Sequence, residues 1–337
     1  MRAVEYFTPD SDPADAVREV DRPMPVPGSG QLRLRITASA VCRTDLQLVT
    51  GQLPPHLLPV VPGHQVVGVV DAVGPDVSGW QVGDRAGLVW LAQACGRCRF
   101  CLSDRENLCL HAEFTGWDVD GGYAEYVVSQ ADFTHHLDVL GDAMSDEAVA
   151  PLLCGGVIGF RSLRVAGVGA DSAGQRLGLY GFGASATIAL QVARHWGVEV
   201  YVVTRSDAEV ERATALGATW AGTYDQALPV KLDAAITFAP VGAVVVDAVK
   251  ALDRGGVVAI NAIHLDELPA MNYDDLWWER SIRSVANVTR EDVREFLPLV
   301  AAAGITTQFE ELPLEDAPVA LTRVAAGDVR GAFVLRP

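Results

Sequence analysis

Hydrophobic and polar residues alternate over short stretches in the first 150 residues of the chain, as they do in half-buried strands. Turn-forming pairs such as Pro-Gly, Gly-Asp and Gly-Gly separate these stretches. We expect strands within four segments: 31–41, 66–74, 84–92 and 121–129. The N-terminal part of the chain therefore predicts a β-rich domain with little helix.

The pattern changes at Ser145, a good N-cap for a helix over residues 146–165 that Pro151 should break or kink. Beyond it, buried apolar runs alternate with amphipathic segments of helical period. Strands are expected at 176–182, 199–206, 232–239 and 256–263, and helices at 184–197, 207–217 and 241–255. Strands that alternate with helices of this length indicate a parallel sheet with crossover helices.

The C-terminal segment returns to mixed character. It predicts a helix at 290–304, a strand at 307–312, a helix at 315–327 and a closing strand at 331–336. A chain of 337 residues is long for one domain and is typical of two.

Composition narrows the classes of partner. The net charge of −17 argues against nucleic acid and against an anionic membrane surface. No uninterrupted apolar stretch reaches about 18 residues, and the first residues lack the pattern of a signal peptide. We therefore expect a cytoplasmic protein.

Four of the six cysteines are crowded into one loop with the spacing C-x2-C-x2-C-x7-C: Cys95, Cys98, Cys101 and Cys109. Four thiolates from one compact loop suit zinc, and a closed four-thiolate set leaves no coordination position for substrate. The site should therefore be structural. An iron–sulfur cluster is the alternative, although its common bacterial motif has three residues before the last cysteine, not seven.

A glycine-rich turn follows the expected strand at 176–182 and matches G-x-G-x-x-[GA]: Gly181, Phe182, Gly183, Ala184, Ser185 and Ala186. Gly181 permits the tight turn, Gly183 lets the backbone approach a pyrophosphate, and the helix N-terminus offers N–H groups to the phosphates. In this strand–turn–helix context the motif predicts a dinucleotide site.

The next strand should end near the adenosine ribose, where an acidic residue would bind the 2′-hydroxyl of NAD. Thr204, Arg205 and Ser206 stand there without an acid. Arg205 suits the 2′-phosphate of NADP(H), and the two hydroxyls can donate to it. The alternative is a solvent-exposed loop arginine.

Cys42, His64 and Cys154 remain. Each alone is compatible with a buried core residue, which is the usual outcome for a lone histidine. Together they form a two-thiolate, one-imidazole set, a known catalytic zinc arrangement with an open fourth position. They are far apart in the sequence, so only the fold can bring them together.

Several motifs occur in the order that is typical of zinc-dependent medium-chain alcohol dehydrogenases: CRTDL (42–46), PGHQVVGVV (62–70), the four-cysteine loop, DGGYAEY (120–126), PLLCGG (151–156) and GFGASA (181–186). The resemblance spans essentially the whole chain and is closest to the bacterial and cinnamyl-type branch. It implies an α/β protein with two domains. By this resemblance we expect a GroES-like β domain (1–153 and 288–337), a Rossmann domain with a doubly wound parallel sheet (154–287) and an active site in the cleft between them.

The resemblance also implies roles for individual residues. Cys42, His64 and Cys154 become the catalytic zinc ligands, and Asp45 orients His64. By the same resemblance Arg43 contacts the cofactor pyrophosphate, and Thr44 carries the hydroxyl nearest the substrate oxygen.

Two positions depart from the family pattern. Gln65 follows His64 where the family usually has glutamate, and Gln47 stands where a relay histidine often receives the proton. Either the two glutamines alter the chemistry, or they are neutral variants of similar shape.

These observations predict a zinc-dependent alcohol dehydrogenase or aldehyde reductase with two zinc ions per chain, which uses NADP(H) and favours carbonyl reduction. The alternatives are a reductase of conjugated C=C or C=N bonds and a non-catalytic nucleotide-binding member. Five apolar residues fall near family pocket positions and suggest an apolar or aromatic substrate: Leu53, Trp90, Leu91, Trp117 and Ile263, the last also expected beside the cofactor. The family implies a homodimer or homotetramer.

Overall fold

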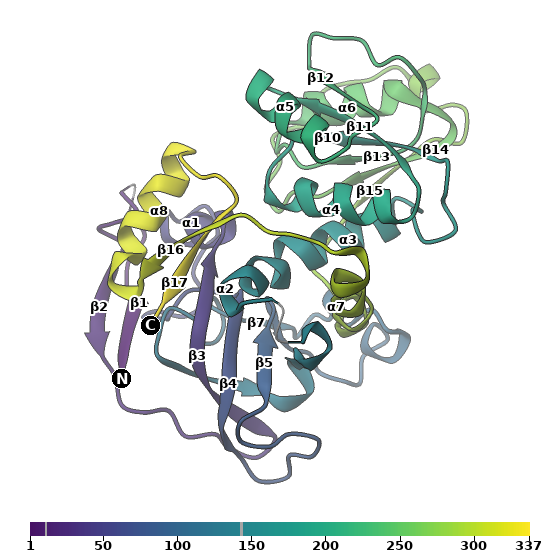
Figure 1. Ribbon diagram of the computed structural model, residues 1–337. Helices are drawn as coiled ribbons and strands as arrows, with labels where there is room; N and C mark the ends of the chain where they lie inside the picture. The colour runs from purple at the N-terminus through teal and green to yellow at the C-terminus, as the bar shows by residue number, and fades with distance from the viewer. Residues whose placement is uncertain (11, 142–143) are drawn as a thin grey trace. The chain divides into compact units, whose positions relative to one another are not determined.

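The computed structural model describes residues 1–10, 12–141 and 144–337. The chain divides into two compact units (Figure 1). The first comprises Met1–Cys154, Asn287–Ala301 and Thr306–Pro337, and the second comprises Gly155–Ala286 with Ala302–Ile305. The C-terminal part of the chain thus belongs mainly to the same unit as the N-terminal part.

The first unit is built on a seven-stranded sheet in which neighbouring strands run β16-β17-β3-β4-β5-β9, with β8 also paired to β3. Its elements are β1 (Arg2–Tyr6), β2 (Val17–Asp21), β3 (Gln31–Val41), α1 (Arg43–Val49), β4 (Val66–Val73), β5 (Arg85–Leu88), β6 (Leu91–Gln93), β7 (Glu113–Phe114), β8 (Tyr126–Gln130), β9 (Thr134–His136), α7 (Arg290–Ala303), whose last two residues belong to the second unit, β16 (Phe309–Pro313), α8 (Ala317–Ala326) and β17 (Ala332–Arg336). The pairings are antiparallel except that between β16 and β17. The predicted β-rich N-terminal domain is confirmed.

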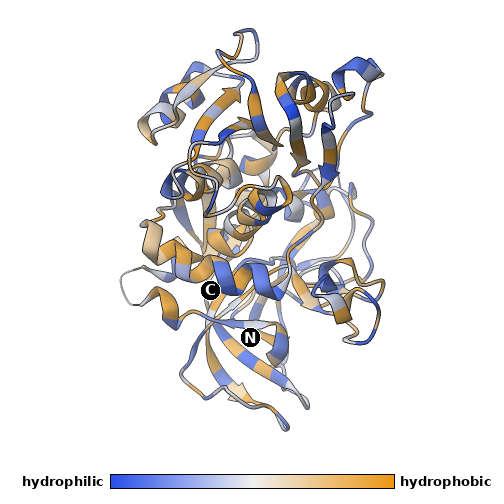
Figure 2. Ribbon diagram, turned by 90° about the vertical axis from the view of Figure 1, so that its right-hand side faces the viewer, coloured by the Kyte–Doolittle hydropathy of each residue, from blue (hydrophilic) through white to orange (hydrophobic). Residues whose placement is uncertain are grey.

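Alternation of side chains explains β3. Its even-numbered positions from Leu32 to Ala40 are buried, and several of those between are partly exposed. Figure 2 shows hydrophobic and hydrophilic residues alternating along the strands near the N-terminus. Burial of one face is the driving force for this sheet.

Two expected strands differ from the structure. The segment 84–92 forms β5 and β6 in different sheets, because the chain leaves the large sheet between them. The segment 121–129 is a strand only from Tyr126, since its first residues lie tightly against another loop. A Cβ on Gly121 would come within 2.0 Å of the Gly63 carbonyl oxygen.

The second unit is a six-stranded sheet, parallel throughout, with strand order β12-β11-β10-β13-β14-β15. Its elements are α3 (Gly155–Val165), β10 (Arg176–Tyr180), α4 (Ala184–His195), β11 (Glu199–Thr204), α5 (Asp207–Ala215), β12 (Trp220–Thr223), β13 (Leu232–Thr237), α6 (Gly242–Ala251), β14 (Leu252–Ile260) and β15 (Ser281–Ser284). The order is that of a Rossmann fold, with crossover helices between the strands. The predicted parallel sheet is confirmed.

The segment around Pro151 breaks as its sequence predicts. Ser145 caps α2 (Asp146–Val149) by accepting from the Ala148 N–H, and a 3-10 turn, η5 (Ala150–Leu153), precedes α3. Among the described residues, Asp146–Val165 passes a length and composition test for a membrane span. However, 61% of its apolar window is buried inside the protein, as in an ordinary core helix.

Candidate active site

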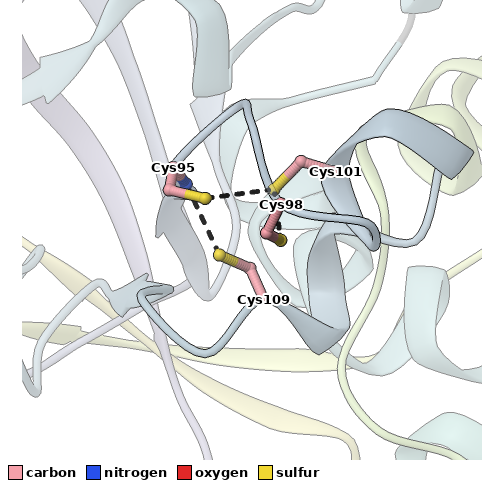
Figure 3. Close-up of side chains that lie close together, drawn as sticks. All are labelled: Cys95, Cys98, Cys101 and Cys109. Atoms are coloured by element: carbon pink, nitrogen blue, oxygen red, sulfur yellow. Dashed lines mark hydrogen bonds between the residues drawn. The ribbon is translucent and has the colours of Figure 1, made fainter.

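The four-cysteine loop brings its sulfur atoms together in the first unit (Figure 3). All four lie within 4.8 Å of one another: Cys95, Cys98, Cys101 and Cys109. The Sγ atom of Cys101 lies 3.5 Å from that of Cys98 and 3.9 Å from that of Cys95. A tetrahedral zinc site with Zn–S of about 2.3 Å needs sulfur atoms about 3.8 Å apart. The donor set therefore fits zinc.

Backbone groups of the loop favour thiolates there. The N–H groups of Cys95 and His111 both donate to the Cys109 sulfur, at 3.5 and 3.3 Å. Backbone N–H groups, first that of Arg97, lower the pKa of Cys95 to about 6. Thiolates are the form that binds a metal, so the loop is electrostatically prepared for one.

A second donor cluster forms from three distant segments. The ligand atoms of Cys42, His64 and Cys154 lie within 4.8 Å of one another, and His64 Nε2 is 3.3 Å from the Cys154 sulfur. In the antiparallel register of β3 and β4, Ser39 pairs with Val66. This pairing puts the residues after β3 and those before β4 at one end of the sheet.

Asp45 organises this cluster. Its Oδ1 lies 2.9 Å from His64 Nδ1, and its Oδ2 accepts from the Cys42 N–H at 2.8 Å and from the Tyr123 hydroxyl at 3.2 Å. With Nδ1 held by the carboxylate, Nε2 faces the two sulfur atoms. The position before His64 requires glycine, because the φ of Gly63 is +95° and a Cβ there would lie 2.4 Å from the Tyr123 ring.

The electrostatics of the cluster follow from burial and from these contacts. Burial opposes a charged imidazole, but the Asp45 carboxylate and the Cys42 sulfur together outweigh it and raise the pKa of His64 to about 10. The hydrogen bond with Cys154 lowers the pKa of Cys42 well below its ordinary value and raises that of Cys154. Two sulfur donors and one imidazole form a known catalytic zinc set with a fourth position left for substrate.

The other predicted residues of this region lie on or near α1. The Thr44 hydroxyl is 3.8 Å from the Cys42 sulfur, Gln47 is half-buried, and Arg43 is exposed. Their predicted roles toward substrate and cofactor stay predictions.

Gln65 has a defined place in the fold. The residue is 4% exposed, and its Nε2 donates to the Ala40 carbonyl oxygen at 3.3 Å. A carboxylate cannot donate such a bond. The amide is therefore tied to the end of β3 rather than free in a cavity.

In the second unit, the glycine-rich turn links β10 to α4. Gly181 has φ +90°, which favours glycine, and space is open where a Cβ on Gly183 would lie. Gly183 is the N-cap of α4, and no side chain caps it. Ala184 and Ser185 form the first turn beyond it, and Phe182 is buried. The uncapped helix N-terminus and open approach fit a bound pyrophosphate.

The end of β11 holds an acid that our sequence analysis missed. Thr204 is fully buried and donates its hydroxyl to Glu209 of α5. Arg205 Nε lies 4.0 Å from the other carboxylate oxygen, and its side chain is 79% exposed. Ser206 caps α5 by accepting from the Glu209 N–H at 3.4 Å. The Ser-x-x-Glu spacing is typical of a helix cap and does not indicate a contact between Glu209 and the strand end.

Arg212, one turn further along α5, was also missed. Its guanidinium donates to the Phe182 carbonyl oxygen and lies 5.2 Å from the Phe182 ring centroid. α5 is thereby attached to the glycine-rich turn.

Comparisons with known proteins decide the family. Residues 28–139 match the alcohol dehydrogenase GroES-like domain, and residues 186–302 match the zinc-binding dehydrogenase family. The "Probable alcohol dehydrogenase AdhA" of Mycobacterium tuberculosis is 44% identical over 99% of this chain and 97% of its own length. The chain belongs to the zinc-dependent medium-chain alcohol dehydrogenase family. It is accordingly an enzyme, an oxidoreductase of the alcohol/aldehyde type.

Further alcohol dehydrogenases support the assignment. One from Geobacillus stearothermophilus is 34% identical over 95% of each chain. A cobalt- and zinc-bound thermostable alcohol dehydrogenase from Pyrobaculum aerophilum has a TM-score of 0.88 with 26% identity, and the match covers 100% of this chain and 99% of that one. The expected GroES-like and Rossmann domains are confirmed. The domain boundaries at 153/154 and 287/288 stay predictions.

A cluster of aromatic side chains lies next to the second donor cluster of this alcohol dehydrogenase: Trp90, Phe114, Trp117 and His56. The ring centroids of Trp90 and His64 are 6.1 Å apart, and Trp90 stacks on Trp117 at 5.8 Å with an interplanar angle of 12°. Trp117 in turn stacks on His56 at 4.1 Å, and Phe114 contacts both tryptophans. Both predicted tryptophans therefore lie on one surface that begins beside His64.

The other three residues that were expected near the pocket lie in different parts of the protein. Leu53 is half-buried after α1, and its N–H donates to the Gln47 carbonyl oxygen at 2.9 Å. Leu91 is 2% exposed and belongs to the core. Ile263 lies in the second unit and is 49% exposed.

Proposed function

We propose that this alcohol dehydrogenase carries two zinc ions per chain and interconverts alcohols with aldehydes or ketones. Cys42, His64 and Cys154 would hold the catalytic ion, and the four-cysteine loop would hold the structural one. The convergence of the three distant donors, with Asp45 fixing the imidazole, carries this proposal. When bound, zinc polarises the carbonyl oxygen and the nicotinamide carries the hydride.

The protein's own side chains orient the substrate and move its proton. Asp45 fixes the ring orientation of His64, and Thr44 supplies a hydroxyl beside the sulfur of Cys42. Since Gln47 cannot accept a proton at neutral pH, the Thr44 hydroxyl would hold the substrate's proton and exchange it with water.

Carbonyl reduction is the favoured direction in this proposal. Gln65 fills the place of a family glutamate without its negative charge. A neutral neighbour leaves a bound zinc ion a stronger Lewis acid toward a carbonyl oxygen. Because Gln65 is buried and hydrogen-bonded, its neutral side chain is fixed in this position, which supports the proposed effect on a bound zinc ion.

NADP(H) is the proposed cofactor because Arg205 stands at the end of β11 with most of its side chain exposed. A charge-assisted contact to the 2′-phosphate contributes about 1.5–3 kcal/mol. Arg205→Ala should therefore raise the dissociation constant for NADPH roughly ten- to a hundredfold, and that for NADH little. Equal effects on both cofactors would contradict the proposed preference.

The aromatic cluster supports an apolar or aromatic substrate, because Trp90 lies beside His64 and Trp117 stacks on Trp90. We further propose a cytoplasmic homodimer or homotetramer, as the family resemblance implies.

A substrate panel tests the proposed activity. NADPH oxidation is followed with aliphatic and aromatic aldehydes, conjugated enals and imines. We expect turnover of aldehydes, with aromatic ones preferred. Turnover confined to C=C or C=N bonds, or none at all, would contradict the proposal.

A further inference from the structure

The carboxylate of Glu209 lies at the end of β11, although the residue itself belongs to α5. Its Oε2 accepts the Thr204 hydroxyl, and its Oε1 lies 4.0 Å from Arg205 Nε. One acid thus engages two of the three residues that the strand end offers to a cofactor. Its side chain is 22% exposed, so it is close to solvent and within reach of a ligand.

Helix capping alone does not account for this position. In a capping box, the third helical residue would bond back to the backbone N–H of the N-cap residue. Ser206 performs its half by accepting from the Glu209 N–H at 3.4 Å. The Glu209 carboxylate instead points back to the strand, where it bonds Thr204.

The same face of α5 also contacts the glycine-rich turn. Arg212 follows Glu209 by three residues, which places both on one side of the helix. Because Arg212 bonds the Phe182 carbonyl oxygen, that side faces the turn. In Rossmann domains, the adenosine ribose lies between this turn and the end of the second strand, which here is β11.

We propose that Glu209 limits the preference for NADP(H) and allows NAD(H) to bind. This inference rests on the proposed role of Arg205. The carboxylate accepts from Thr204, faces Arg205 and repels a 2′-phosphate, whereas its remaining lone pairs accept a hydrogen bond from a ribose 2′-hydroxyl. Arg205 and Glu209 thus oppose each other at one site, and the enzyme binds both cofactors.

The matched variants are Glu209→Gln and Glu211→Gln. Both remove one negative charge from α5, but residues two apart on a helix point to different sides, and Glu211 is exposed. Glutamine keeps an acceptor for Thr204, so Glu209→Gln should fold normally. Dissociation constants for NADPH and NADH are measured by cofactor fluorescence, and those for adenosine 2′,5′-bisphosphate and 5′-AMP by calorimetry.

Glu209→Gln should tighten NADPH and adenosine 2′,5′-bisphosphate binding by about tenfold and weaken NADH binding a few-fold. Glu211→Gln should shift each constant by less than about twofold. An unchanged ratio of NADPH to NADH affinity in Glu209→Gln, or an equal shift in Glu211→Gln, would overturn the inference. Arg205→Ala separates the two proposals. If it leaves the ratio unchanged while Glu209→Gln still weakens NADH binding, the NADP(H) preference fails, and only the contact of Glu209 with the ribose of NAD(H) stands.

Discussion

Gln65 is held at the end of β3 by a hydrogen bond that a glutamate cannot make. In Gln65→Glu, the carboxylate would face the Ala40 carbonyl oxygen and add negative charge beside His64. We expect the kcat/KM for aldehyde reduction to fall by about tenfold. Steady-state kinetics measure the change.

Gln65→Met is the control, because it removes the same hydrogen bond without adding charge. We expect Gln65→Met to retain most of the reductase activity. If the two variants lose activity equally, packing and not charge explains the role of Gln65.

Gln47 does not titrate, and it stands where the family often has a relay histidine. Gln47→His should introduce an ionisation near pH ~6.5 into the rate of alcohol oxidation and raise that rate at neutral pH. The pH–rate profiles of wild type and variant, in both directions, provide the measurement. An oxidation profile that the substitution leaves unchanged would make Gln47 a neutral replacement.

At the scale of elements, the four-cysteine loop is fastened to α7 through Glu106. This buried carboxylate accepts from the backbone N–H of Arg290 at 3.0 Å and from its Nε at 3.2 Å. Burial alone would raise the pKa of Glu106, but the hydrogen bonds from Arg290 outweigh burial and lower it. The helix α7 and the four-cysteine loop are thus joined by one ionised side chain.

Glu106→Gln should lower the free energy of unfolding at pH 7 by about 1.5–3 kcal/mol. Since the folded pKa is lowered, the stabilisation is complete above the unfolded value of about 4.3 and is lost as pH falls through the folded pKa. Wild type and variant should therefore converge in acid. Urea unfolding of wild type and variant at pH 7 and in acid measures this convergence, and Glu113→Gln, at an exposed residue, is the control. A gap that persists in acid would exclude the ionised carboxylate as the cause.

Helices and strands could be predicted from the sequence where a single hydrophobic periodicity continued over the whole element. β3 begins and ends where its alternation predicts, at Gln31 and Val41. The sequence pattern does not predict the short strands β1, β2, β7, β9, β12 and β15, because two to five residues carry too little pattern. The expected strand at 84–92 forms two strands because β5 pairs within the large sheet and β6 pairs with β7. The local sequence does not indicate these pairing partners.

The candidate site could be predicted where a local motif carried it. The four-cysteine loop and the glycine-rich turn are contiguous, so spacing alone indicated them. The roles of Tyr123 and Glu209 could not be predicted from a local motif, because each contacts a residue outside its own segment. Tyr123 reaches Asp45, 78 residues away. Glu209 stands five residues beyond the strand end that it serves.

For the whole molecule, the two donor clusters have different consequences. Binding of a structural zinc ion to the four-cysteine loop contributes directly to folding. Cys95→Ala should therefore reduce soluble yield and lower the unfolding temperature. In contrast, Cys154→Ala should leave the unfolding temperature nearly unchanged, because η5 and β3 pack around it independently of a metal.

The central claim is that Cys42, His64 and Cys154 hold a catalytic zinc ion separate from the structural one. Zinc per chain, measured by mass spectrometry of purified protein together with aldehyde reduction, tests it most directly. Wild type should contain about two zinc ions, and Cys154→Ala about one, with a retained fold and aldehyde reduction at least about 100-fold slower. A Cys154→Ala protein that keeps two zinc ions and full activity would contradict the account.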